Sequence, residues 1–387
     1  MSQGYNTAGV QEIEVVEDKK WMRLALELAK KGEGKVSPNP MVGAVLIKEG
    51  KLIAAGYYRY FGGPHAEVEA IEKAKNEARG TTLYVSLEPC NRYGKTPPCT
   101  QKIIQAGIKK VVAATLDPTS GEGIKQLEKE GIETQIGTCE EEAKEVNEAF
   151  FKYIKRRVPF VTVKVASSLD GKIATHKRES RWITSEEARK FTHSLRDKMD
   201  AVLVGINTII SDDPSLLPPS KKNFARIVLD SKLRIPLEAR ILIDQERADT
   251  FIFTTPQADK QKLKELENKG VKVAIIQAEE GRVDLTEVLK KLGELEIMNL
   301  LVEGGGEVIA SFFKKKSVDK IFLFLAPRII GGRDAPTWVE GKGVDFLKET
   351  PYIDINSVKK IGEDFLLEGY PKQTPEADIS TYSFPEN

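Results

Sequence analysis

The sequence contains very few cysteines and histidines, three of each among 387 residues. So few cysteines exclude a disulfide-stabilised scaffold and are typical of a reducing compartment, so we expect a cytoplasmic location. The first residues, MSQGYNTAGVQEIEVVEDKK, show no basic segment followed by an apolar one, and we expect no secretory signal.

The sequence also lacks an excess of charge of either sign and any long apolar run. The net charge is +1, which gives no electrostatic reason to expect a nucleic-acid or membrane partner. The longest apolar runs, such as IFLFLA at 321–326, are far shorter than the roughly 20 residues that span a membrane. The length exceeds what one compact core normally holds, so two domains are expected.

Predicted strands and helices alternate along the first part of the chain, which indicates an α/β layered domain over residues 18–155. Apolar residues at helical spacing predict a first helix from Asp18 to Lys31, after a poorly ordered tail at 1–17. Strands are expected at 41–47, 51–58, 81–87 and 109–115. Further helices are expected at 65–74, 98–107, around 124–130 and at 139–155.

A second α/β domain is predicted over 156–370, followed by a polar tail at 371–387. The boundary is placed in FFKYIKRRVPF at 150–160, where a long helix ends in a basic cluster and Pro159. Its strands are expected at 161–168, 201–205, 226–230, 250–255, 271–276, 299–305 and 320–326. Helices are expected at 185–199, 259–269, 284–292 and 305–315.

One set of residues in the first domain matches a catalytic metal site. His65, Cys90 and Cys99 supply three ligands, the number that catalytic zinc takes when a fourth position stays open. Each lies at or near the start of a predicted helix, whose positive end favours a thiolate. Glu67 follows His65 with one residue between, and H-x-E…P-C is the signature of zinc deaminases, in which the glutamate moves protons.

Two alternatives leave part of this pattern unexplained. Cys90 and Cys99 form a disulfide in the first, and are unrelated thiols in the second. Neither gives His65 and Glu67 a role. A purely structural zinc site has no use for a carboxylate two residues from a ligand, whereas hydrolysis needs a proton carrier.

The segment between the cysteines, CNRYGKTPPC, is longer than the C-x-x-C of nucleobase deaminases. It carries Arg92 and Lys95, two cations that suit an anionic group of a substrate, although exposed loop cations often have no such role. Upstream, two prolines bracket Asn39 in SPNP, and its amide offers both a donor and an acceptor to a base edge.

These segments resemble a known family. SPNPMVGAV, PHAEVEA and EPCNRYGKTPPC are similar to the pyrimidine deaminase domain of riboflavin biosynthesis, within the cytidine deaminase superfamily. VTVKVASSLDGKIA, SRWITS, TIISDDPSL and LLVEGGGEVIASF resemble the reductase half of the same bifunctional enzyme, whose fold is similar to dihydrofolate reductase. The resemblance covers about residues 18–370.

The resemblance implies two reactions and two cofactors. Zinc, one ion per chain, would serve the hydrolytic deamination of 2,5-diamino-6-(ribosylamino)-4(3H)-pyrimidinone 5'-phosphate. NADPH would then reduce the ribosyl group to ribityl, giving 5-amino-6-(ribitylamino)uracil 5'-phosphate. The implied partner is this small phosphorylated pyrimidine, with no nucleic acid and no membrane, and the chain is expected to form a homo-oligomer, a dimer or a tetramer.

The resemblance also assigns residues of the second domain. The three glycines after the predicted strand at 299–305 allow close backbone approach to a phosphate at a helix start. Cofactor contacts match Ala166, Trp182, Thr208, Asp212, Ser231, Gly305, Gly306, Glu307, Val308, Ile309, Ala310 and Ser311. Substrate contacts match Ser180, Arg196, Leu216 and Glu303. Lys164 is added because Lys164 and Asp170 form a polar pair within the strand and turn of VKVASSLDG, which suggests a site.

One departure from the family pattern concerns the phosphate of the substrate. After DDPSL the family has an arginine, and Pro219 occupies the matching position here. Either Lys221 or Lys222 supplies the positive charge of the missing arginine, or Arg196 alone binds the phosphate.

Two other functions stay open at this point. The first is a nucleoside or tRNA deaminase with an accessory domain, which the near-neutral net charge disfavours. The second is a zinc-stabilised binding protein, which Glu67 disfavours.

Overall fold

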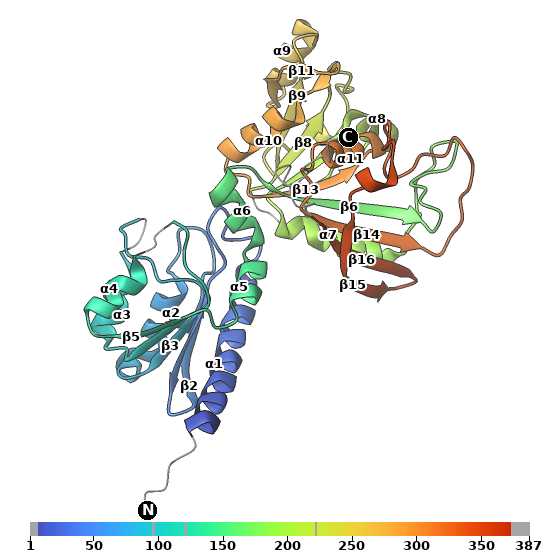
Figure 1. Ribbon diagram of the computed structural model, residues 1–387. Helices are drawn as coiled ribbons and strands as arrows, with labels where there is room; N and C mark the ends of the chain where they lie inside the picture. Colours follow the sequence, from blue (N-terminus) through green and yellow to red (C-terminus); the bar gives the residue numbers. More distant parts are fainter. Residues whose placement is uncertain (1–6, 95–96, 120–121, 221–222, 373–387) are drawn as a thin grey trace, which may run out of the picture. The chain divides into compact units, whose positions relative to one another are not determined.

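The computed structural model describes the backbone of residues 7–94, 97–119, 122–220 and 223–372, with side chains from Val16 onward. The chain forms two compact units, one of Met1–Pro159 with Leu292–Met298, the other of Phe160–Lys291 with Asn299–Asn387 (Figure 1). Within the described part of the chain, no helix is long and apolar enough to cross a membrane.

The first unit is built on a five-stranded sheet in the order β2-β1-β3-β4-β5. Its strands are β1 (Gly43–Lys48), β2 (Lys51–Tyr57), β3 (Thr82–Val85), β4 (Lys110–Ala113) and β5 (Glu133–Ile136). The strands β1, β2 and β3 pair antiparallel, whereas β3, β4 and β5 run parallel. Its helices are α1 (Thr7–Ala29), α2 (Ala66–Ala74), α3 (Cys99–Ala106), α4 (Gly123–Lys129), α5 (Glu140–Val146) and α6 (Glu148–Arg156).

Side chains alternate between the two faces of this sheet and give it two cores, as the period of two of a β-strand requires. Ala44 and Leu46 of β1 pack with residues of α2, α3 and α4. Val45 and Ile47, their neighbours, pack with residues of α1 and α5. Helices therefore cover both faces, an α/β/α arrangement.

The second unit is built on a nine-stranded sheet in the order β10-β9-β8-β7-β13-β6-β14-β16-β15. The seven strands from β10 to β14 are parallel, so their carboxyl ends share one edge, and β16 and β15 are antiparallel. Their bounds are β6 (Phe160–Ser168), β7 (Ala201–Gly205), β8 (Ala225–Leu229), β9 (Asp249–Thr254), β10 (Lys272–Ile275), β13 (Asn299–Gly304), β14 (Lys320–Ala326), β15 (Ile353–Ile361) and β16 (Asp364–Pro371).

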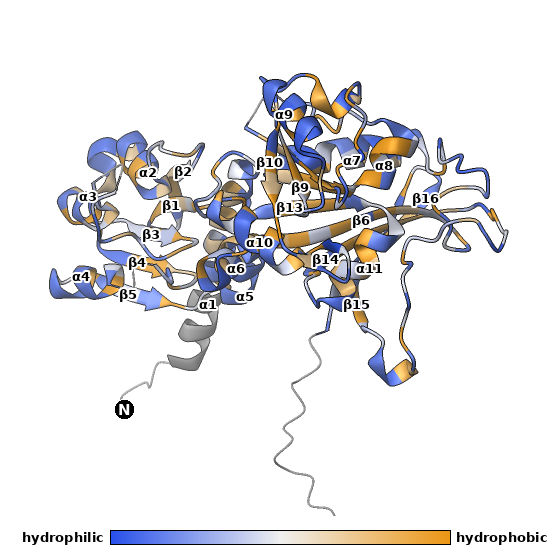
Figure 2. Cartoon of the chain, turned by 90° about the horizontal axis from the view of Figure 1, so that it is seen from above, coloured by the Kyte–Doolittle hydropathy of each residue, from blue (hydrophilic) through white to orange (hydrophobic). Residues whose placement is uncertain are grey.

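The central strands of this sheet are buried on both faces, as in other parallel sheets covered by helices. All five residues of β7 are buried, and β6 is coloured mostly as hydrophobic in Figure 2. A short hairpin, β11 (Ala278–Glu279) with β12 (Arg282–Val283), follows β10. The remaining helices are α7 (Glu186–Lys198), α8 (Ile206–Asp212), α9 (Lys260–Asn268), α10 (Leu285–Glu294) and α11 (Gly306–Lys314).

The structure corrects the sequence predictions at several places. The first helix begins at Thr7 rather than Asp18, because extending a helix requires no new nucleation and Gln11, Glu12 and Glu14 are good helix formers. The helix predicted at 139–155 is broken at Asn147 into α5 and α6. The strands β5, β15 and β16 and the helix α8 were not predicted. The predicted tail lies, from residue 373 on, outside the described residues.

Candidate active sites

The predicted metal ligands come together from three elements of the first unit. His65 is the residue before α2, Cys90 lies in the loop after β3, and Cys99 is the first residue of α3. Their ligand atoms all lie within 4.8 Å of one another. The arrangement excludes a disulfide in this structure, where both cysteines are free thiols.

The distances fit a zinc ion. The Nδ1 atom of His65 lies 3.6 Å from Cys90 Sγ and 3.2 Å from Cys99 Sγ. Tetrahedral zinc with Zn–S of about 2.3 Å and Zn–N of about 2.0 Å places such ligand atoms roughly 3.5 Å apart. One imidazole with two thiolates is also a donor set that zinc accepts in catalytic sites, with one position left for water.

A hydrogen bond links the two thiols. The hydrogen bond with Cys99 lowers the pKa of Cys90 to about 4, and the same hydrogen bond raises the pKa of Cys99. The Sγ of Cys90 also accepts a hydrogen bond of 3.3 Å from the backbone N–H of Cys99. The lowered pKa of Cys90 favours its thiolate, the form that binds metal.

Glu67 lies on the first turn of α2 and is only 3% exposed. Its Oε2 has no hydrogen-bond partner among the described residues. Burial raises the pKa of the carboxyl to about 7, and a bound zinc ion would lower that pKa by its positive charge. A buried carboxyl group with one unsatisfied oxygen is expected to act on a bound molecule.

Tyr58 connects the metal ligand to the predicted substrate residue, and the sequence reasoning missed it. Its ring packs edge-on against His65, with centroids 5.4 Å apart. Its hydroxyl oxygen accepts hydrogen bonds from Asn39 Nδ2 at 2.9 Å and from the Gly62 N–H at 2.8 Å. Tyr58 thus fixes the direction of the Asn39 amide. The adjacent tyrosines YY at 57–58 gave no sign of this role.

The long loop beside the metal ligands is only partly described. Arg92 donates a hydrogen bond of 2.7 Å to Thr119 Oγ1, and Lys95 lies outside the described residues. Glu88, before the first cysteine, is buried and accepts from the N–H groups of Asp117 and Ile124. Glu88 therefore ties the Cys90 loop to α4.

The second unit holds a pocket of about 1290 Å³ along the carboxyl ends of its parallel strands. Nearly all the predicted cofactor and substrate residues line it. They are Lys164, Ala166, Ser180, Trp182, Arg196, Thr208, Asp212, Leu216, Ser231, Glu303, Gly305, Gly306, Glu307, Val308, Ile309 and Ser311. Ala310 does not line the pocket, since its side chain lies on the side of α11 that faces Gly341.

The glycines of this pocket fit a phosphate group. Gly304 and Gly305 have φ angles of 156° and 80°, and a Cβ on either would have no neighbour closer than 3.5 Å. The backbone is therefore open to a close ligand. Gly305 caps α11 without a side-chain hydrogen bond, so N–H groups of the first turn remain for an anion.

A buried cluster of charges lies in the same pocket. The Arg196 guanidinium donates to both Glu303 oxygens, at 2.6 and 2.9 Å, and the two side chains are 12% and 8% exposed. Burial would raise the pKa of Glu303, but the charges of Arg196 and Lys164 lower it to about 2. Burial lowers the pKa of Lys164. His193, which also lines the pocket, was not predicted.

The position of the missing arginine lies away from this pocket. Pro219 is exposed and does not line it, and Lys221 and Lys222 lie outside the described residues. Two of the Arg196 nitrogens are already bound to Glu303. Other cations of the pocket wall, such as Arg178 and Arg189, are also available to an anion.

Comparison with known proteins agrees with both sites. A model of the cytidine and deoxycytidylate deaminase zinc-binding region matches residues 15–115, and a model of the RibD C-terminal domain matches residues 159–367. The folds and sites define a two-part enzyme, a zinc-binding deaminase followed by a reductase. The fold class predicted from the sequence is thereby confirmed.

Relatives match both parts together. The riboflavin biosynthesis protein RibD of Aquifex aeolicus is 47% identical over 90% of this chain and 97% of its own, and that of Escherichia coli K12 is 33% identical over 91% and 99%. The chain belongs to the RibD family, bifunctional deaminase/reductases of riboflavin biosynthesis.

Solved structures are similar to this chain over both parts. Acinetobacter baumannii RibD superposes with a TM-score of 0.83 at 34% identity, covering 93% of this chain and all of that one. The diaminohydroxyphosphoribosylaminopyrimidine deaminase/5-amino-6-(5-phosphoribosylamino)uracil reductase of Thermotoga maritima gives 0.82 at 37% identity, with the same coverage.

Replacing Tyr58 with Phe tests its role in positioning Asn39. The variant loses both hydrogen bonds of the hydroxyl but keeps the ring against His65. A neutral hydrogen bond contributes about 1 kcal/mol, so we expect the deaminase KM to rise roughly fivefold while zinc content stays unchanged. Tyr57→Phe is the matched control, because among the residues that the structure describes the Tyr57 hydroxyl accepts a hydrogen bond only from exposed Arg59. An unchanged KM in Tyr58→Phe would contradict this role.

Replacing Arg196 with Ala leaves Glu303 buried and unpaired, and we expect the second unit to lose about 3–5 kcal/mol of unfolding free energy in denaturant titrations. Because the pKa of Glu303 is lowered from 4.5 to about 2, the stabilisation from its ionised form is complete above pH 4.5 and disappears as the pH falls toward 2. This pH dependence should be missing in the variant.

Lys190→Ala, on the same helix, serves as the control for Arg196→Ala. Lys190 forms an exposed pair with Glu186, and such pairs contribute about 0–1 kcal/mol. Equal losses in the two variants would show that the Arg196–Glu303 pair does not stabilise the unit.

Proposed function

We propose that this chain deaminates 2,5-diamino-6-(ribosylamino)-4(3H)-pyrimidinone 5'-phosphate in its first unit and reduces the ribosyl group of the product in its second. The convergence of His65, Cys90 and Cys99 beside the buried Glu67 is the observation that carries the proposal. The phosphate-accepting glycines and the buried Lys164–Glu303–Arg196 cluster support the second reaction.

His65, Cys90 and Cys99 are proposed to hold one zinc ion per chain. Zinc bound by three such residues supplies an activated water for hydrolysis. Glu67 takes a proton from the attacking water and delivers it to the exocyclic amino nitrogen at C2 of the pyrimidinone. The water oxygen bonds to C2, the C–N bond breaks and ammonia leaves. The second proton of the water moves to the ring nitrogen, so a carbonyl remains at C2. The unsatisfied Oε2 of Glu67 supports this role.

Asn39 is proposed to orient the pyrimidinone. Tyr58 accepts one of the amide hydrogens of Asn39, so the second hydrogen and the carbonyl oxygen remain for the donor and acceptor groups of the ring. A base edge with adjacent donor and acceptor suits this pair. Arg92 and Lys95 stay candidates for the 5'-phosphate in this unit, and their role is not assigned.

Lys164 is proposed to act as the acid of the second reaction. NADPH supplies a hydride to C1 of the sugar. Before that, the bond between C1 and the ring oxygen must break, and the ring oxygen needs a proton. Lys164 Nζ lies in the pocket with its pKa lowered by burial, so it gives up a proton more readily than an exposed lysine.

Glu303 and Arg196 are proposed to position the sugar, with Ser180 and Leu216 as further substrate contacts. Because Arg196 is bound to Glu303, it orients that carboxylate toward the sugar hydroxyls and contributes its remaining nitrogen to the 5'-phosphate. Ser180 Oγ donates a hydrogen bond of 3.2 Å to Asp212 Oδ1. A proposed substrate contact and a proposed cofactor contact are therefore neighbours, which supports binding of the two molecules side by side.

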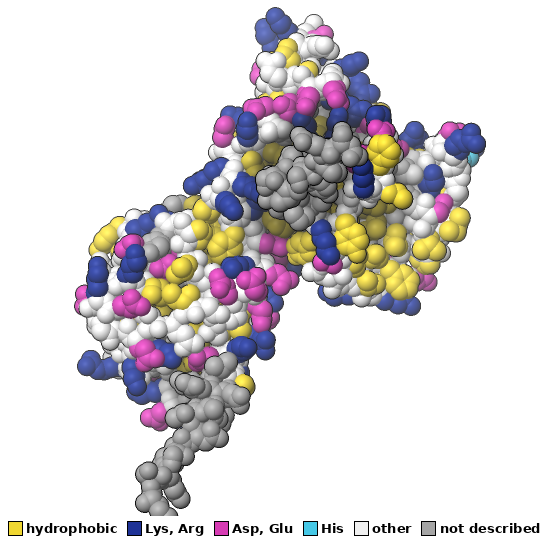
Figure 3. All heavy atoms as spheres, viewed as in Figure 1, with side chains coloured by type: hydrophobic (Ala, Val, Ile, Leu, Met, Phe, Trp, Pro, Cys, Tyr) yellow, Lys and Arg dark blue, Asp and Glu magenta, His cyan; other side chains and the backbone are white. Residues whose placement is uncertain are grey.

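A homo-oligomer and a cytoplasmic location remain predictions. Exposed apolar side chains on β15 and β16 favour a homo-oligomer. Ile355, Val358 and Phe365 are 45%, 62% and 45% exposed, and hydrophobic side chains gather over this part of the sheet in Figure 3.

Glu67→Gln removes the proton carrier and keeps the shape of the side chain. We expect ammonia release to fall by about a hundredfold or more, since general acid–base groups contribute roughly that factor. Zinc content, measured by elemental analysis, should stay at the wild-type level. Glu72→Gln, exposed on the same helix α2, is the matched control. Loss of zinc together with activity would make Glu67 structural instead.

Lys164→Met removes the acid of the second reaction at nearly constant side-chain length. We expect the kcat of NADPH oxidation to fall about a hundredfold, with NADP+ affinity unchanged. In the wild type kcat should fall as pH rises through the lowered pKa of Lys164, because the protonated form is required. Lys177→Met, in an exposed loop, is the control. A wild-type kcat in Lys164→Met would reject Lys164 as the acid.

A further inference from the structure

One of the largest fully buried side chains of the second unit is an arginine that neither reaction uses. Arg226 of β8 is 0% exposed, and it lies on the same face of the sheet as Val228, a member of the hydrophobic core. Burial lowers the pKa of its guanidinium only to about 10, so Arg226 is charged at neutral pH. A buried charge is costly unless a carboxylate pairs with it.

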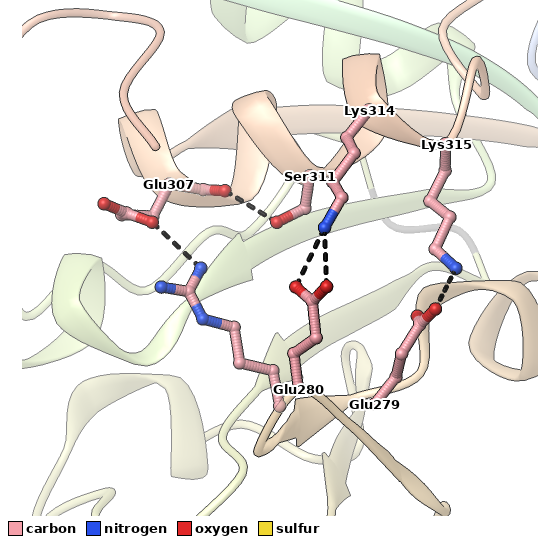
Figure 4. A network of polar contacts seen from close by, with 7 residues as sticks. Glu279, Glu280, Glu307, Ser311, Lys314 and Lys315 are labelled. Carbon is pink, nitrogen blue, oxygen red and sulfur yellow. Dashed lines mark hydrogen bonds and ion pairs between the residues drawn. The ribbon is translucent and has the colours of Figure 1, made fainter. Parts of the chain in front are cut away.

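The hydrogen bonds of Arg226 to described residues all go to backbone carbonyl groups and none to a carboxylate. The usual arrangement of a cation is seen in Figure 4, where Lys314 pairs with Glu280 at 2.8 Å and both side chains are exposed. An apolar side chain of similar volume at position 226 would avoid the cost of burying a charge. Arg226 is therefore expected to have a role that an apolar side chain cannot fill.

The three carbonyl groups belong to two loops. Arg226 Nη2 donates to the oxygens of Ile243 and Ala248, at 3.0 and 2.8 Å, in the loop before β9. Its Nη1 donates to the Ser215 oxygen at 3.3 Å, in the segment after α8. Ser215 and the next residue, Leu216, line the pocket. Arg226 thus connects a core strand to the pocket wall.

The backbone at Ser215 and Leu216 has the features of an anion site. Leu216 has a φ of 53°, a left-handed conformation that is unfavourable for a residue with a Cβ. Its side chain is 4% exposed and packs in the core, so the backbone is the part that it offers to the pocket. Among the described residues, the N–H groups of Ser215 and Leu216 have no hydrogen-bond partner. Consecutive N–H groups in such turns form concave sites for anions.

Arg226 acts on this turn through a single peptide group. The Ser215 carbonyl and the Leu216 N–H belong to the same planar, resonant unit. A charged donor at the carbonyl oxygen fixes the plane of that unit and polarises it, which makes the N–H a stronger donor. The positive charge of Arg226 therefore reaches the pocket without the side chain being exposed.

The two acidic residues before the turn are bound to other donors. Asp213 Oδ1 accepts the backbone N–H of Arg240 at 2.8 Å, and Asp212 Oδ1 accepts from the Ser180 hydroxyl at 3.2 Å. Neither carboxylate is bound to the N–H groups of the turn, which stay available to a ligand.

We propose that Arg226 is a positioning residue for the substrate of the second reaction. By holding the Ser215 carbonyl, it fixes the turn whose N–H groups bind the 5'-phosphate of the sugar. This role rests on the proposed reductase function. It gives the phosphate a contact in a chain where Pro219 stands at the position of the family's arginine.

Arg226→Met tests this role, because it removes the charge and the donors at similar volume. NADPH oxidation by the full-length, zinc-loaded chain is measured with the deaminated product of the first reaction, with and without its 5'-phosphate. In the wild type the phosphate should raise kcat/KM. This phosphate effect should be about tenfold smaller in the variant, the loss expected for a hydrogen bond to a charged group. The change should appear in KM, since a phosphate far from C1 contributes uniform binding.

Arg226→Lys keeps the charge and one group of donors, so the phosphate effect should fall only about threefold. This variant carries the test if Arg226→Met does not fold. Thr250→Val is the matched control, because Thr250 Oγ1 donates to the Ile241 oxygen at 2.9 Å in the same loop before β9 but does not contact the turn. Its phosphate effect should equal that of the wild type.

The outcomes separate the positioning role from a structural one. A general loss of packing would lower kcat/KM equally with and without the phosphate, and that result would overturn the proposal. An unchanged phosphate effect in the Arg226 variants, a wild type that gains nothing from the phosphate, or a loss of NADP+ affinity alone would overturn it as well. A wild type that oxidises NADPH with neither substrate would overturn the proposed reductase function itself.

Discussion

The first unit depends on one geometric constraint, the meeting of two thiols and one imidazole within 4.8 Å. This requires residues of three separate segments, at the start of α2, after β3 and at the start of α3, to lie next to one another. Cys99 opens α3 and His65 precedes α2, while Glu88 fastens the Cys90 loop to α4 through two backbone N–H groups. Gly123 allows this approach, because a Cβ there would lie 1.9 Å from the Pro89 carbonyl oxygen. The packing of α2, α3 and α4 on one sheet face thus determines the metal site.

In the second unit, charged side chains are buried in a pocket that is proposed to bind anionic ligands. Glu303 stays ionised there because Arg196 binds both of its oxygens. Its negative charge in turn offsets the burial of Lys164. Around the pocket wall the loops after β8 and β10 present further cations, and the parallel strands bring them to one edge. The two proposed reactions are therefore assigned to two different arrangements, the three candidate metal ligands and the buried charge cluster.

Much of this arrangement could be predicted from the sequence. The metal ligands and Glu67 follow from residue type and spacing, and strands such as 201–205 and 320–326 were predicted to the residue, because continuous apolar runs mark buried parallel strands. Tyr58 could not be predicted, since its role arises from contacts with residues 19 and 7 positions away that only the fold brings together. The strand β15 was missed because most of its residues are exposed, and β16 was missed because Asp364, Glu368 and Gly369 interrupt its apolar pattern.

The central claim is that one chain performs both steps, with the metal needed only for the first. The most direct test is a coupled assay that follows ammonia release and NADPH oxidation separately, on the zinc-loaded chain and after chelation of the metal. With the diamino substrate, the loaded chain should release ammonia before an equal amount of NADPH is oxidised. The chelated chain should release none and still oxidise NADPH when given the deaminated product. Ammonia release without any NADPH oxidation by the loaded chain would contradict the account.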